Sequence, residues 1–369
     1  MALKTIIFWY NYPPVVTAEL IVELARLNNN RVILVTFSDF TTTRKSIGWT
    51  KLSHPDLEVV DLSDKQNVGE HITELLNISD SHHVFNGFQS RSFKEVISSF
   101  KKRDNLKFDI ILERPNFTAP AIRLKKVYFF IKYSLLFFQY RNSLSRVLAV
   151  GQSAVSFYQG CLFTKNKIAH YLYTPNQKNR PIKLKNYMNS QAVHFLYVGR
   201  IKYSTRGVDL LKEFPRLKGN WKLDIVGDYG EDYDNLYTTI SAHDRIDFLG
   251  KWPMDKVVEQ MQKYDVILAP SRYEGWNLNV NEAFHAGVPC ICTPYSGSNH
   301  LVERGRFGYV VKRSEFIACC QSIINDPEKL EVLNDNLVNF RNQFSKANLS
   351  LYLEDLFSNA SYRTKPEWL

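Results

Sequence analysis

Short apolar runs of strand length alternate with segments of helical apolar spacing along the whole chain, and this alternation constrains the fold most. The first three runs are TIIFWY at residues 5–10, RVILVTF at 31–37 and HHVFNGF at 82–88. Apolar runs that alternate with helical segments are typical of parallel sheets whose faces are covered by helices. The pattern therefore predicts an α/β protein with largely parallel sheets.

The alternation continues to the end of the chain, with one interruption. The remaining predicted strands are FDIILE at 108–113, RVLAVG at 146–151, HFLYVG at 194–199, WKLDIVG at 221–227, RIDFLG at 245–250, DVILAP at 265–270, VPCICT at 288–293 and YVV at 309–311. Residues 174–191 are polar and aperiodic and contain proline, which is typical of a linker. We therefore predict two open α/β domains, at residues 1–180 and 190–345, and an amphipathic helical tail at 346–369.

Three simple features favour a cytoplasmic location. Four of the five cysteines lie in the apolar runs VPCICT and FIACC, which predicts packed thiols rather than disulfides or a zinc site. The first apolar run is short and ends in a polar turn, unlike a signal peptide. No stretch approaches the roughly 18 apolar residues that a membrane-spanning helix needs.

The formal net charge of +10 is unevenly distributed. Residues 114–208 contain 16 Lys and Arg but no Asp or Glu, so the rest of the chain carries a net charge of −6. A local excess of this size favours a polyanionic partner such as nucleic acid, anionic lipid or a phosphorylated substrate. A solvated basic face is the alternative.

Basic and aromatic residues are densest at 121–146, which we expect to be helical. The cations Arg123, Lys125, Lys126, Lys132, Arg141 and Arg146 accompany Tyr128, Phe129, Phe130, Leu135, Leu136, Phe137 and Phe138. Cations beside aromatics suit a helix that lies on an anionic membrane, so we expect peripheral membrane contact here. Alternatively, the aromatics form the core of the first domain and the cations its solvated edge.

The most informative stretch is DVILAPSRYEGWNLNVNEAFHAGVPCICTP at residues 265–294. A buried strand ends at Pro270, and a helix starts near Asn279 and ends at Gly287. Seven residues separate Glu274 in the loop from Glu282 in the first turn of the predicted helix. Backbone N–H groups at a helix N-terminus favour a diphosphate, whereas carboxylates accept hydrogen bonds from sugar and ribose hydroxyls.

This stretch resembles the E-x7-E segment of the retaining GT-B glycosyltransferases of family four, the glycosyl transferases group 1. Four further segments are similar to the family in order and spacing, at residues 195–214, 223–230, 245–275 and 296–311. The resemblance is close over residues 194–312. In the amino-terminal half it rests on strand order and on RVLAVGQSA (146–154) and YLYTPN (171–176).

The resemblance implies a GT-B fold, in which two Rossmann-like α/β domains face each other across a cleft. Residues 1–180 would bind the acceptor, residues 190–345 the nucleotide sugar, and the helix in 346–369 would cross back to the first domain. The implied reaction transfers a sugar, with retention, from a UDP- or GDP-sugar to a hydroxyl of a glycan or glycolipid. Assembly of bacterial surface polysaccharide or lipopolysaccharide is the expected setting. The nucleotide sugar is a substrate, and no cofactor is expected.

Site roles follow from the match and from chemistry. Arg200 and Arg206 follow a strand in a basic stretch, where guanidinium groups can clamp a diphosphate leaving group. With Glu274, which would face the transferred hexose, they are the expected catalytic residues. The expected donor-binding residues are Gly199, Trp252, Tyr273, Gly275, Trp276, Asn277, Leu278, Asn279 and Glu282, with Glu282 accepting the ribose hydroxyls. Asn277 replaces a family Gly and tolerates a left-handed backbone.

The amino-terminal half departs from the family pattern at two places. Residues 13–16 read PPVV where the family often has Gly-Gly, and the strand ending at 113 is followed by no family His. The acceptor-side candidates are therefore Tyr12, Glu113 and Arg114.

A possible metal motif and two alternative functions remain. Residues 232–234 spell D-x-D, a metal–diphosphate motif of another glycosyltransferase fold, but their loop resembles an ordinary strand-to-helix turn of the family, so no metal is expected. The alternatives are a GT-B nucleotide-sugar epimerase and a non-catalytic basic protein that binds membranes or nucleic acid. The complete set of Arg200, Arg206, Glu274 and Glu282 favours the transferase, without a nucleic-acid partner.

Overall fold

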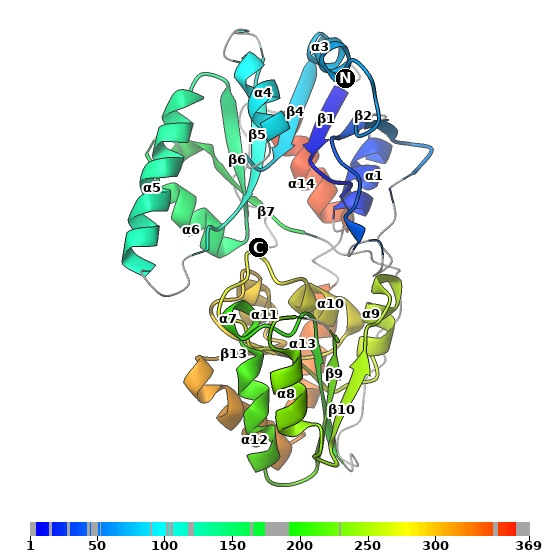
Figure 1. Cartoon of the computed structure of the whole chain (residues 1–369), viewed down its shortest axis with the longest axis vertical. Coiled ribbons are helices and arrows are strands. Elements are labelled where there is room, and N and C mark those ends of the chain that lie inside the picture. Colours follow the sequence, from blue (N-terminus) through cyan, green and yellow to red (C-terminus); the bar gives the residue numbers. More distant parts are fainter. Residues whose placement is uncertain are drawn as a thin grey trace. The chain divides into compact units, whose positions relative to one another are not determined.

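The computed structural model describes residues 5–14, 17–27, 30–42, 45, 51, 53–88, 91–100, 103, 106–116, 122–162, 165–173, 192–228, 230–341 and 346–358. The predicted linker at 174–191 lies outside these residues. The chain divides into two compact units (Figure 1). The first comprises Met1–Pro115, Ile122–Asn176 and Ser345–Leu369, and the second comprises Asn116–Ala121 and Gln177–Phe344.

The first unit contains a seven-stranded sheet in the order β3-β2-β1-β4-β5-β6-β7, in which every neighbouring pair is parallel. The strands are β1 Thr5–Tyr10, β2 Arg31–Thr36, β3 Glu58–Asp61, β4 Ser81–Asn86, β5 Phe108–Glu113, β6 Leu144–Val150 and β7 Ile168–Tyr171. The inner strands are apolar along nearly their whole length because helices cover both faces of a parallel sheet.

The helices of this unit are α1 Ala18–Arg26, α3 Val68–Leu76, α4 Arg91–Phe100, α5 Ile122–Gln139, α6 Gln152–Gly160 and α14 Lys346–Ser358. Aromatic side chains fill the core, where the rings of Trp9 and Phe85 stack with centroids 5.5 Å apart. The carboxy-terminal helix α14 packs against α1, and Phe357 contacts Phe8 edge to face. Figure 1 shows α14 beside α1 in this unit.

A buried ionic cluster joins α14 to the sheet. The Asp109 carboxylate on β5 accepts a hydrogen bond from Arg146 Nε at 3.1 Å and lies 2.9 Å from His82 Nε2. Burial alone would raise the pKa of Asp109, but His82 and Arg146 hold that pKa below its usual value. Arg146 also donates to the Leu356 carbonyl on α14. Arg146 is thus a buried residue of β6, and its place among the surface cations of 121–146 was wrong.

The second unit contains a six-stranded parallel sheet in the order β10-β9-β8-β11-β12-β13. Its strands are β8 Val193–Val198, β9 Trp221–Val226, β10 Ile246–Gly250, β11 Val266–Ala269, β12 Cys290–Cys292 and β13 Gly308–Val310. Its helices are α7 Tyr203–Arg206, the 3-10 helix η3 Val208–Arg216, α8 Tyr233–Ile240, α9 Met254–Met261, α10 Leu278–Ala286, α11 Asn299–Gly305, the 3-10 helix η4 Arg313–Glu315, α12 Phe316–Asn325 and α13 Lys329–Arg341.

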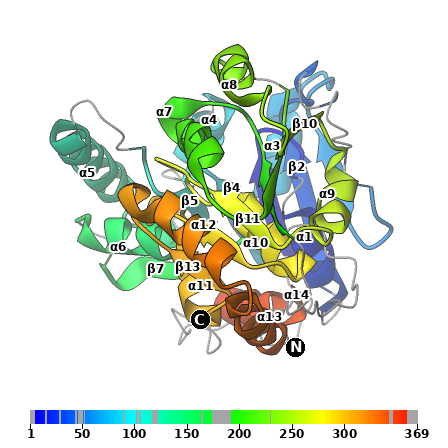
Figure 2. The same cartoon turned by 90° about the horizontal axis from the view of Figure 1, so that it is seen from below.

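The core of the second unit joins the sheet to side chains of η3, α8 and α12. Helix α10 packs against β11 and also contacts α9 and α11 (Figure 2). Two parallel-sheet α/β domains were predicted, and both are confirmed. All five cysteines are free thiols, as expected.

Two strands were not predicted. Strand β3 is a partly exposed edge strand with the sequence EVVD, and β7 is an edge strand of four residues, IAHY. Both are short and carry charged or polar residues, so neither shows the long apolar run that marked the inner strands.

Candidate functional site

The candidate site lies at the carboxyl ends of β8, β9 and β11. These strands are parallel neighbours, so the loops that follow them meet at one edge of the sheet, where α/β proteins bind ligands. Gly199 follows β8 with φ 136°, and Gly227 follows β9 with φ 133°. A Cβ atom on Gly227 would clash with the carbonyl oxygen of Gly199. Glycine at these positions therefore lets the two loops pack backbone against backbone.

The loop after β11, residues 270–277, is held on two sides. Two successive N–H groups of the loop donate to the Thr205 carbonyl of α7, at 2.7 and 3.0 Å. On the other side, a Cβ atom on Gly297 would clash with the carbonyl oxygen of Gly275. The loop is thus packed between the segment after β8 and the segment after β12.

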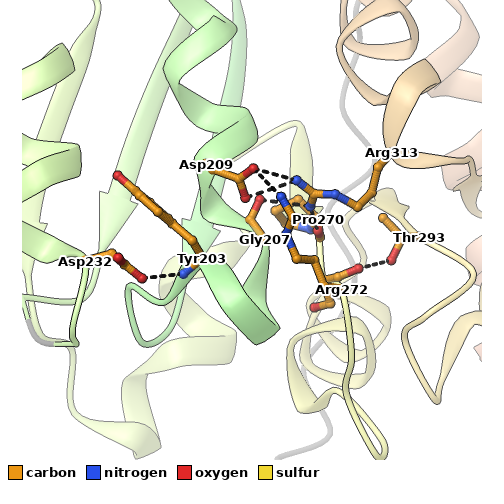
Figure 3. Close-up of polar contacts among 9 residues, drawn as sticks. Tyr203, Gly207, Asp209, Asp232, Pro270, Arg272, Thr293 and Arg313 are labelled. Atoms are coloured by element: carbon orange, nitrogen blue, oxygen red, sulfur yellow. Dashed lines mark hydrogen bonds and ion pairs between the residues drawn. The ribbon is translucent and has the colours of Figure 1, made fainter. Parts of the chain in front are cut away.

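Arg313 braces the base of this loop (Figure 3). Its guanidinium group donates to the carbonyl oxygens of Gly207 and Pro270, at 3.1 and 2.6 Å. It also donates to both carboxylate oxygens of Asp209, at 3.0 and 2.9 Å. Arg272 donates to the same carboxylate at 2.7 Å. One arginine therefore connects the end of α7, η3 and the loop, through an ion pair with Asp209 and two hydrogen bonds to carbonyl oxygens.

Helix α10 begins directly after the loop. Asn277 has φ 78° and ψ 87°, which confirms the left-handed backbone expected there. Helical geometry starts at Leu278, so Glu282 is the fifth helical residue and lies in the second turn. The prediction that it lies in the first turn was wrong, because the helix starts one residue earlier than expected. The helix ends before Gly287, which has φ 75° as a C′ glycine should.

Polar side chains fix the start of α10 to its neighbours. Asn277 Nδ2 donates to Ser271 Oγ at 3.3 Å, and Ser298 Oγ donates to the Asn277 carbonyl at 3.0 Å. The Asn279 side chain donates to the carbonyl of Val198, the last residue of β8. Asn279 therefore links the first turn of α10 to the strand end at which Gly199 and Arg200 lie.

Arg206, Glu274 and Glu282 converge beside this helix terminus. Arg206 Nε lies 2.6 Å from Glu274 Oε1, and both side chains are more than two-thirds buried. Glu282 is 7% exposed. Burial raises the pKa of Glu282 to about 7, although the positive charge of Arg206 acts in the opposite direction. The free site thus contains one ion pair and one carboxyl group that is partly protonated near neutral pH.

Arg200 lies at the same edge but in a different environment. It follows Gly199, its side chain is exposed, and its carbonyl accepts a hydrogen bond from Tyr197 Oη at 2.8 Å. A Cβ atom on Gly199 would lie 3.9 Å from an Arg206 guanidinium nitrogen. Gly199 and Arg206 are therefore neighbours, and Arg200 adjoins them in the chain.

The other residues that were expected to contact the donor differ in their exposure to solvent. Trp276 is 2% exposed, and its ring packs near His300, so the indole is a packing group in this conformation. Trp252 and Tyr273 are half-buried, and the Trp252 ring lies against Tyr264 with centroids 6.1 Å apart. Gly275 is buried and Leu278 is half-buried.

The acceptor-side candidates belong to the first unit. Tyr12 follows β1, whereas Glu113 ends β5 and Arg114 follows it, so all three lie at the carboxyl edge of that sheet. Tyr12 and Arg114 are half-buried, and Glu113 retains exposed surface. Surrounding protein atoms raise the pKa of Glu113, and a hydrogen bond with Tyr173 opposes that rise.

The D-x-D sequence serves the local structure. The Asp232 carboxylate accepts a hydrogen bond from the backbone N–H of Tyr203 at 2.6 Å, which satisfies the first N–H of α7 (Figure 3). Within the described residues, no group of three or more His, Cys, Asp or Glu side chains is arranged to hold a metal ion.

Sequence reasoning missed Arg313 and Asp209, which position the loop without being expected ligand contacts. The two residues are 104 positions apart in the chain, and although Asp209 lies in the family-like segment 195–214, that resemblance gives no pairing with Arg313. The one available signal was Gly207, because a glycine after Arg206 suggests a close approach of another group. Arg313 and the Pro270 carbonyl are the groups that approach it.

Comparison with known proteins places a family match on the second unit. Residues 192–326 match the family described as Glycosyl transferases group 1. The lipopolysaccharide 1,6-galactosyltransferase of Escherichia coli (strain K12) is 32% identical over 142 residues, which are 34% of this chain and 39% of that protein. The chain thus spans about two-fifths of the length of this curated relative.

Solved structures match over nearly the whole chain. WaaG, a glycosyltransferase involved in lipopolysaccharide biosynthesis, superposes with a TM-score of 0.64 at 14% identity, covering 96% of this chain and 100% of that chain. HepE of Anabaena in complex with UDP and glucose gives a TM-score of 0.67 at 17% identity, covering 96% and 99%. At such identities the likeness establishes the fold. This chain has the GT-B fold of two parallel-sheet α/β domains.

Proposed function

We propose that this chain, whose residues 192–326 match glycosyl transferases group 1, is a retaining glycosyltransferase. It would move a sugar from a nucleotide diphosphate donor to a hydroxyl of a glycan or lipid-linked acceptor. The observation that carries the proposal is the convergence of Arg206, Glu274 and Glu282 at the start of α10, within the matched region. This arrangement offers cations for a diphosphate and carboxyl groups for sugar hydroxyls.

The diphosphate of the donor would bind at the start of α10. The Asn277 side chain makes no capping hydrogen bond to α10, so backbone N–H groups of the first turn can donate to phosphate oxygens. Arg206 stands beside the same terminus, and Arg200 is exposed at the neighbouring strand end. The positive end of the helix dipole adds to the attraction of these cations.

In the proposed reaction, the bond between the anomeric carbon and the diphosphate oxygen breaks, and the diphosphate leaves with the electron pair. Arg200 and Arg206 would stabilise the negative charge that develops on the leaving group. The acceptor oxygen forms its bond on the same face of the sugar, and its proton passes to the leaving diphosphate oxygen. Glu274 would hold a hydroxyl of the transferred hexose, and Glu282 the hydroxyls of the ribose.

We propose a UDP-hexose as the donor and a lipopolysaccharide or polyprenol-linked glycan as the acceptor. Two similarities support this choice: HepE was crystallised with UDP and glucose, and the Escherichia coli relative is a lipopolysaccharide galactosyltransferase. Such acceptors are made at the inner leaflet, so the enzyme would act in the cytoplasm with peripheral membrane contact. No metal ion or other cofactor is included in this proposal.

A donor screen tests the proposed function. The purified chain is incubated with UDP-glucose, UDP-galactose or GDP-mannose, with and without bacterial lipid extract, and release of the nucleoside diphosphate is measured. We expect UDP to be released from a UDP-hexose only when acceptor is present, and EDTA to leave the rate unchanged. NMR of the product should show the same anomeric configuration as in the donor. The matched control is Arg206→Ala, which should slow release by an amount equivalent to about 2–4 kcal/mol of activation free energy. Conversion of the donor to its epimer without acceptor would instead favour the epimerase.

A further inference from the structure

Helix α5 carries apolar side chains on two opposite faces. Tyr133 and Phe137 are buried in the core of the first unit, and Phe129, Phe130 and Leu136 pack against that core while partly exposed. Contacts with α6 complete this face, because Tyr133 meets Tyr158 edge to face at 5.1 Å. These residues account for the attachment of α5 to the unit.

The opposite face of α5 is an exposed apolar stripe. We use the name α5 stripe for Leu124, Val127, Tyr128, Ile131, Leu135 and Phe138, which are between 45% and 73% exposed. Their spacing of three or four residues places them on one side of the helix. At about 1.5 Å per residue the stripe is roughly 21 Å long. Figures 1 and 2 both show α5 at the outer edge of the first unit, away from α1.

The stripe is unlike the rest of the described surface. The other strongly exposed large apolar residues in the described ranges are Val59, Leu162, Tyr237, Leu249, Tyr295, Val332 and Leu351, and each lies on a different element or loop. Scattered apolar residues on a surface are ordinary, whereas a contiguous row indicates a site of interaction.

Cations lie along one side of the stripe. Lys125 and Lys132 are seven residues apart, so at about 100° per residue they lie close to the same helical angle, at the border of the stripe. Lys126 is one residue further round and lies on the side of the helix opposite the stripe. Arg141 follows the helix and stacks on the Phe138 ring, with its guanidinium carbon 4.3 Å from the ring centroid.

The charge pattern favours an anionic lipid surface over a second copy of the chain. A symmetric pairing of two α5 stripes would bring Lys125 and Lys132 of both copies together, and like charges across an interface repel. The chain has no acidic residue between 114 and 208, so α5 itself supplies no carboxylate that could pair with these lysines. An anionic membrane offers apolar depth for the stripe and negative charge for its border.

The helix is suited to lie on a membrane and not to cross it. Among the described residues, no helix combines the length and apolar character that a bilayer span requires. In α5 the lysines and the buried face of the helix, which is held in the core, both exclude spanning. An interfacial helix needs only one apolar face and a basic border, and α5 has both.

We propose that the α5 stripe inserts into the headgroup boundary of an anionic membrane, with Lys125 and Lys132 against the lipid phosphates. The first unit is then anchored through α5, and a lipid-linked acceptor would reach the enzyme from the same surface. The arrival of a lipid-linked acceptor from the membrane rests on the proposed function, whereas membrane binding by the α5 stripe does not.

Vesicle co-sedimentation tests the stripe. The full chain should bind vesicles of phosphatidylcholine with 30% phosphatidylglycerol at about 0.05 M salt, and at least tenfold less to phosphatidylcholine alone. Leu124→Ser with Ile131→Ser and Leu135→Ser should reduce the partition coefficient at least tenfold. The matched control is Leu249→Ser with Val332→Ser, which removes exposed apolar residues of the second unit and should leave partitioning unchanged.

The charges have a control on the same helix. Lys125→Glu with Lys132→Glu should reduce binding at least tenfold, whereas Lys126→Glu, on the opposite side, should reduce it less than threefold. Leu135→Trp should show a blue-shifted emission on vesicles and quenching by brominated lipid. The inference would be overturned if Lys126→Glu reduced vesicle binding as much as Lys125→Glu with Lys132→Glu. It would also be overturned if the serine variant of the α5 stripe bound vesicles as well as the wild type, or if the wild type did not bind anionic vesicles at low salt.

The test is separable from the donor screen. UDP binding by calorimetry and the melting temperature should be unchanged in the stripe variants, because α5 belongs to the other unit. Chains that bind UDP but ignore vesicles would contradict the α5 proposal alone. Chains that bind vesicles but turn over no nucleotide sugar would contradict the proposed function alone.

Discussion

Replacing Glu274 by Gln should change nucleotide binding and turnover in opposite directions. The carboxylate is paired with Arg206 at 2.6 Å in the free protein. A diphosphate that binds Arg206 must compete with this carboxylate for the same guanidinium group. Gln keeps the shape and an acceptor oxygen but removes the charge, so UDP should bind the variant more tightly.

The size of the effect follows from the geometry of the pair. Two unit charges about 4 Å apart attract by about 4 kcal/mol at an effective dielectric constant of 20. Hydration and side-chain ordering offset most of that attraction, and the partial exposure of Arg206 lowers it further. About 1 kcal/mol should remain, which corresponds to roughly fivefold tighter binding of UDP. Turnover should slow, with an activation free energy about 1–3 kcal/mol higher, because a charged acceptor for a sugar hydroxyl is lost.

Calorimetry with UDP at pH 7.5 and about 0.1 M salt measures the first effect, and initial rates measure the second. The control is a double-mutant cycle with Arg206→Ala, in which the gain from Glu274→Gln should vanish because no guanidinium is released. Unchanged or weaker UDP binding in the single variant, at an unchanged melting temperature, would refute the competition. A gain that persists without Arg206 would refute the pairing as its cause.

Four further outcomes follow from the site. Arg200→Ala and Arg206→Ala should each raise the activation free energy of turnover by about 2–4 kcal/mol, whereas Arg206→Lys should keep much of the activity. Wild-type rates in both alanine variants would exclude diphosphate binding by these arginines. Glu282→Gln should weaken UDP binding by about 1–3 kcal/mol, as calorimetry would show. The pKa of Glu282 is about 7 in the folded protein and 4.5 in the unfolded chain, so ionising the buried carboxyl group opposes folding. As the pH rises from 4.5 to 7, the free energy of unfolding of Glu282→Gln should therefore increase relative to the wild type by about 2–3 kcal/mol in denaturant titrations. Parallel pH profiles of the two proteins would contradict that pKa. Gly207→Ala should lower the melting temperature by several degrees, because φ is 67° and the new Cβ would clash with the Pro270 carbonyl; no change in melting would show that the loop relaxes easily.

The inner strands could be predicted because helices cover both faces of a parallel sheet, which leaves long apolar runs in the sequence. Strand β3 could not, since EVVD at a half-exposed edge resembles a loop. The meeting of Arg206 with the 274–282 segment was predictable from parallel topology and from the family pattern. The Arg313–Asp209 pair joins residues 104 positions apart, and its one local signal, Gly207, does not identify the partner.

Helix α5 shows a limit of a different kind. Its sequence is apolar on nearly all sides, so periodicity alone could not separate core aromatics from surface aromatics. The interpretation that the aromatics of 121–146 form the core is confirmed for one face of the helix, whereas membrane contact by the other face stays a prediction. Tyr133 and Phe137 belong to the core, whereas Tyr128 and Phe138 are exposed. Only packing against α6 and the sheet decides which face is which.

The electrostatics of the site also depend on packing more than on residue count. Two free, ionised glutamates beside a diphosphate site would repel the ligand. In this structure Arg206 offsets the charge of Glu274, and burial leaves Glu282 partly protonated near pH 7. If the chain binds a nucleotide sugar as proposed, both carboxyl groups can accept hydrogen bonds from sugar and ribose hydroxyls while adding little repulsion toward phosphate. A sequence that shows two arginines and two glutamates suggests a neutral site, whereas the folded arrangement retains a positive bias from Arg200, the start of α10 and the protonated fraction of Glu282.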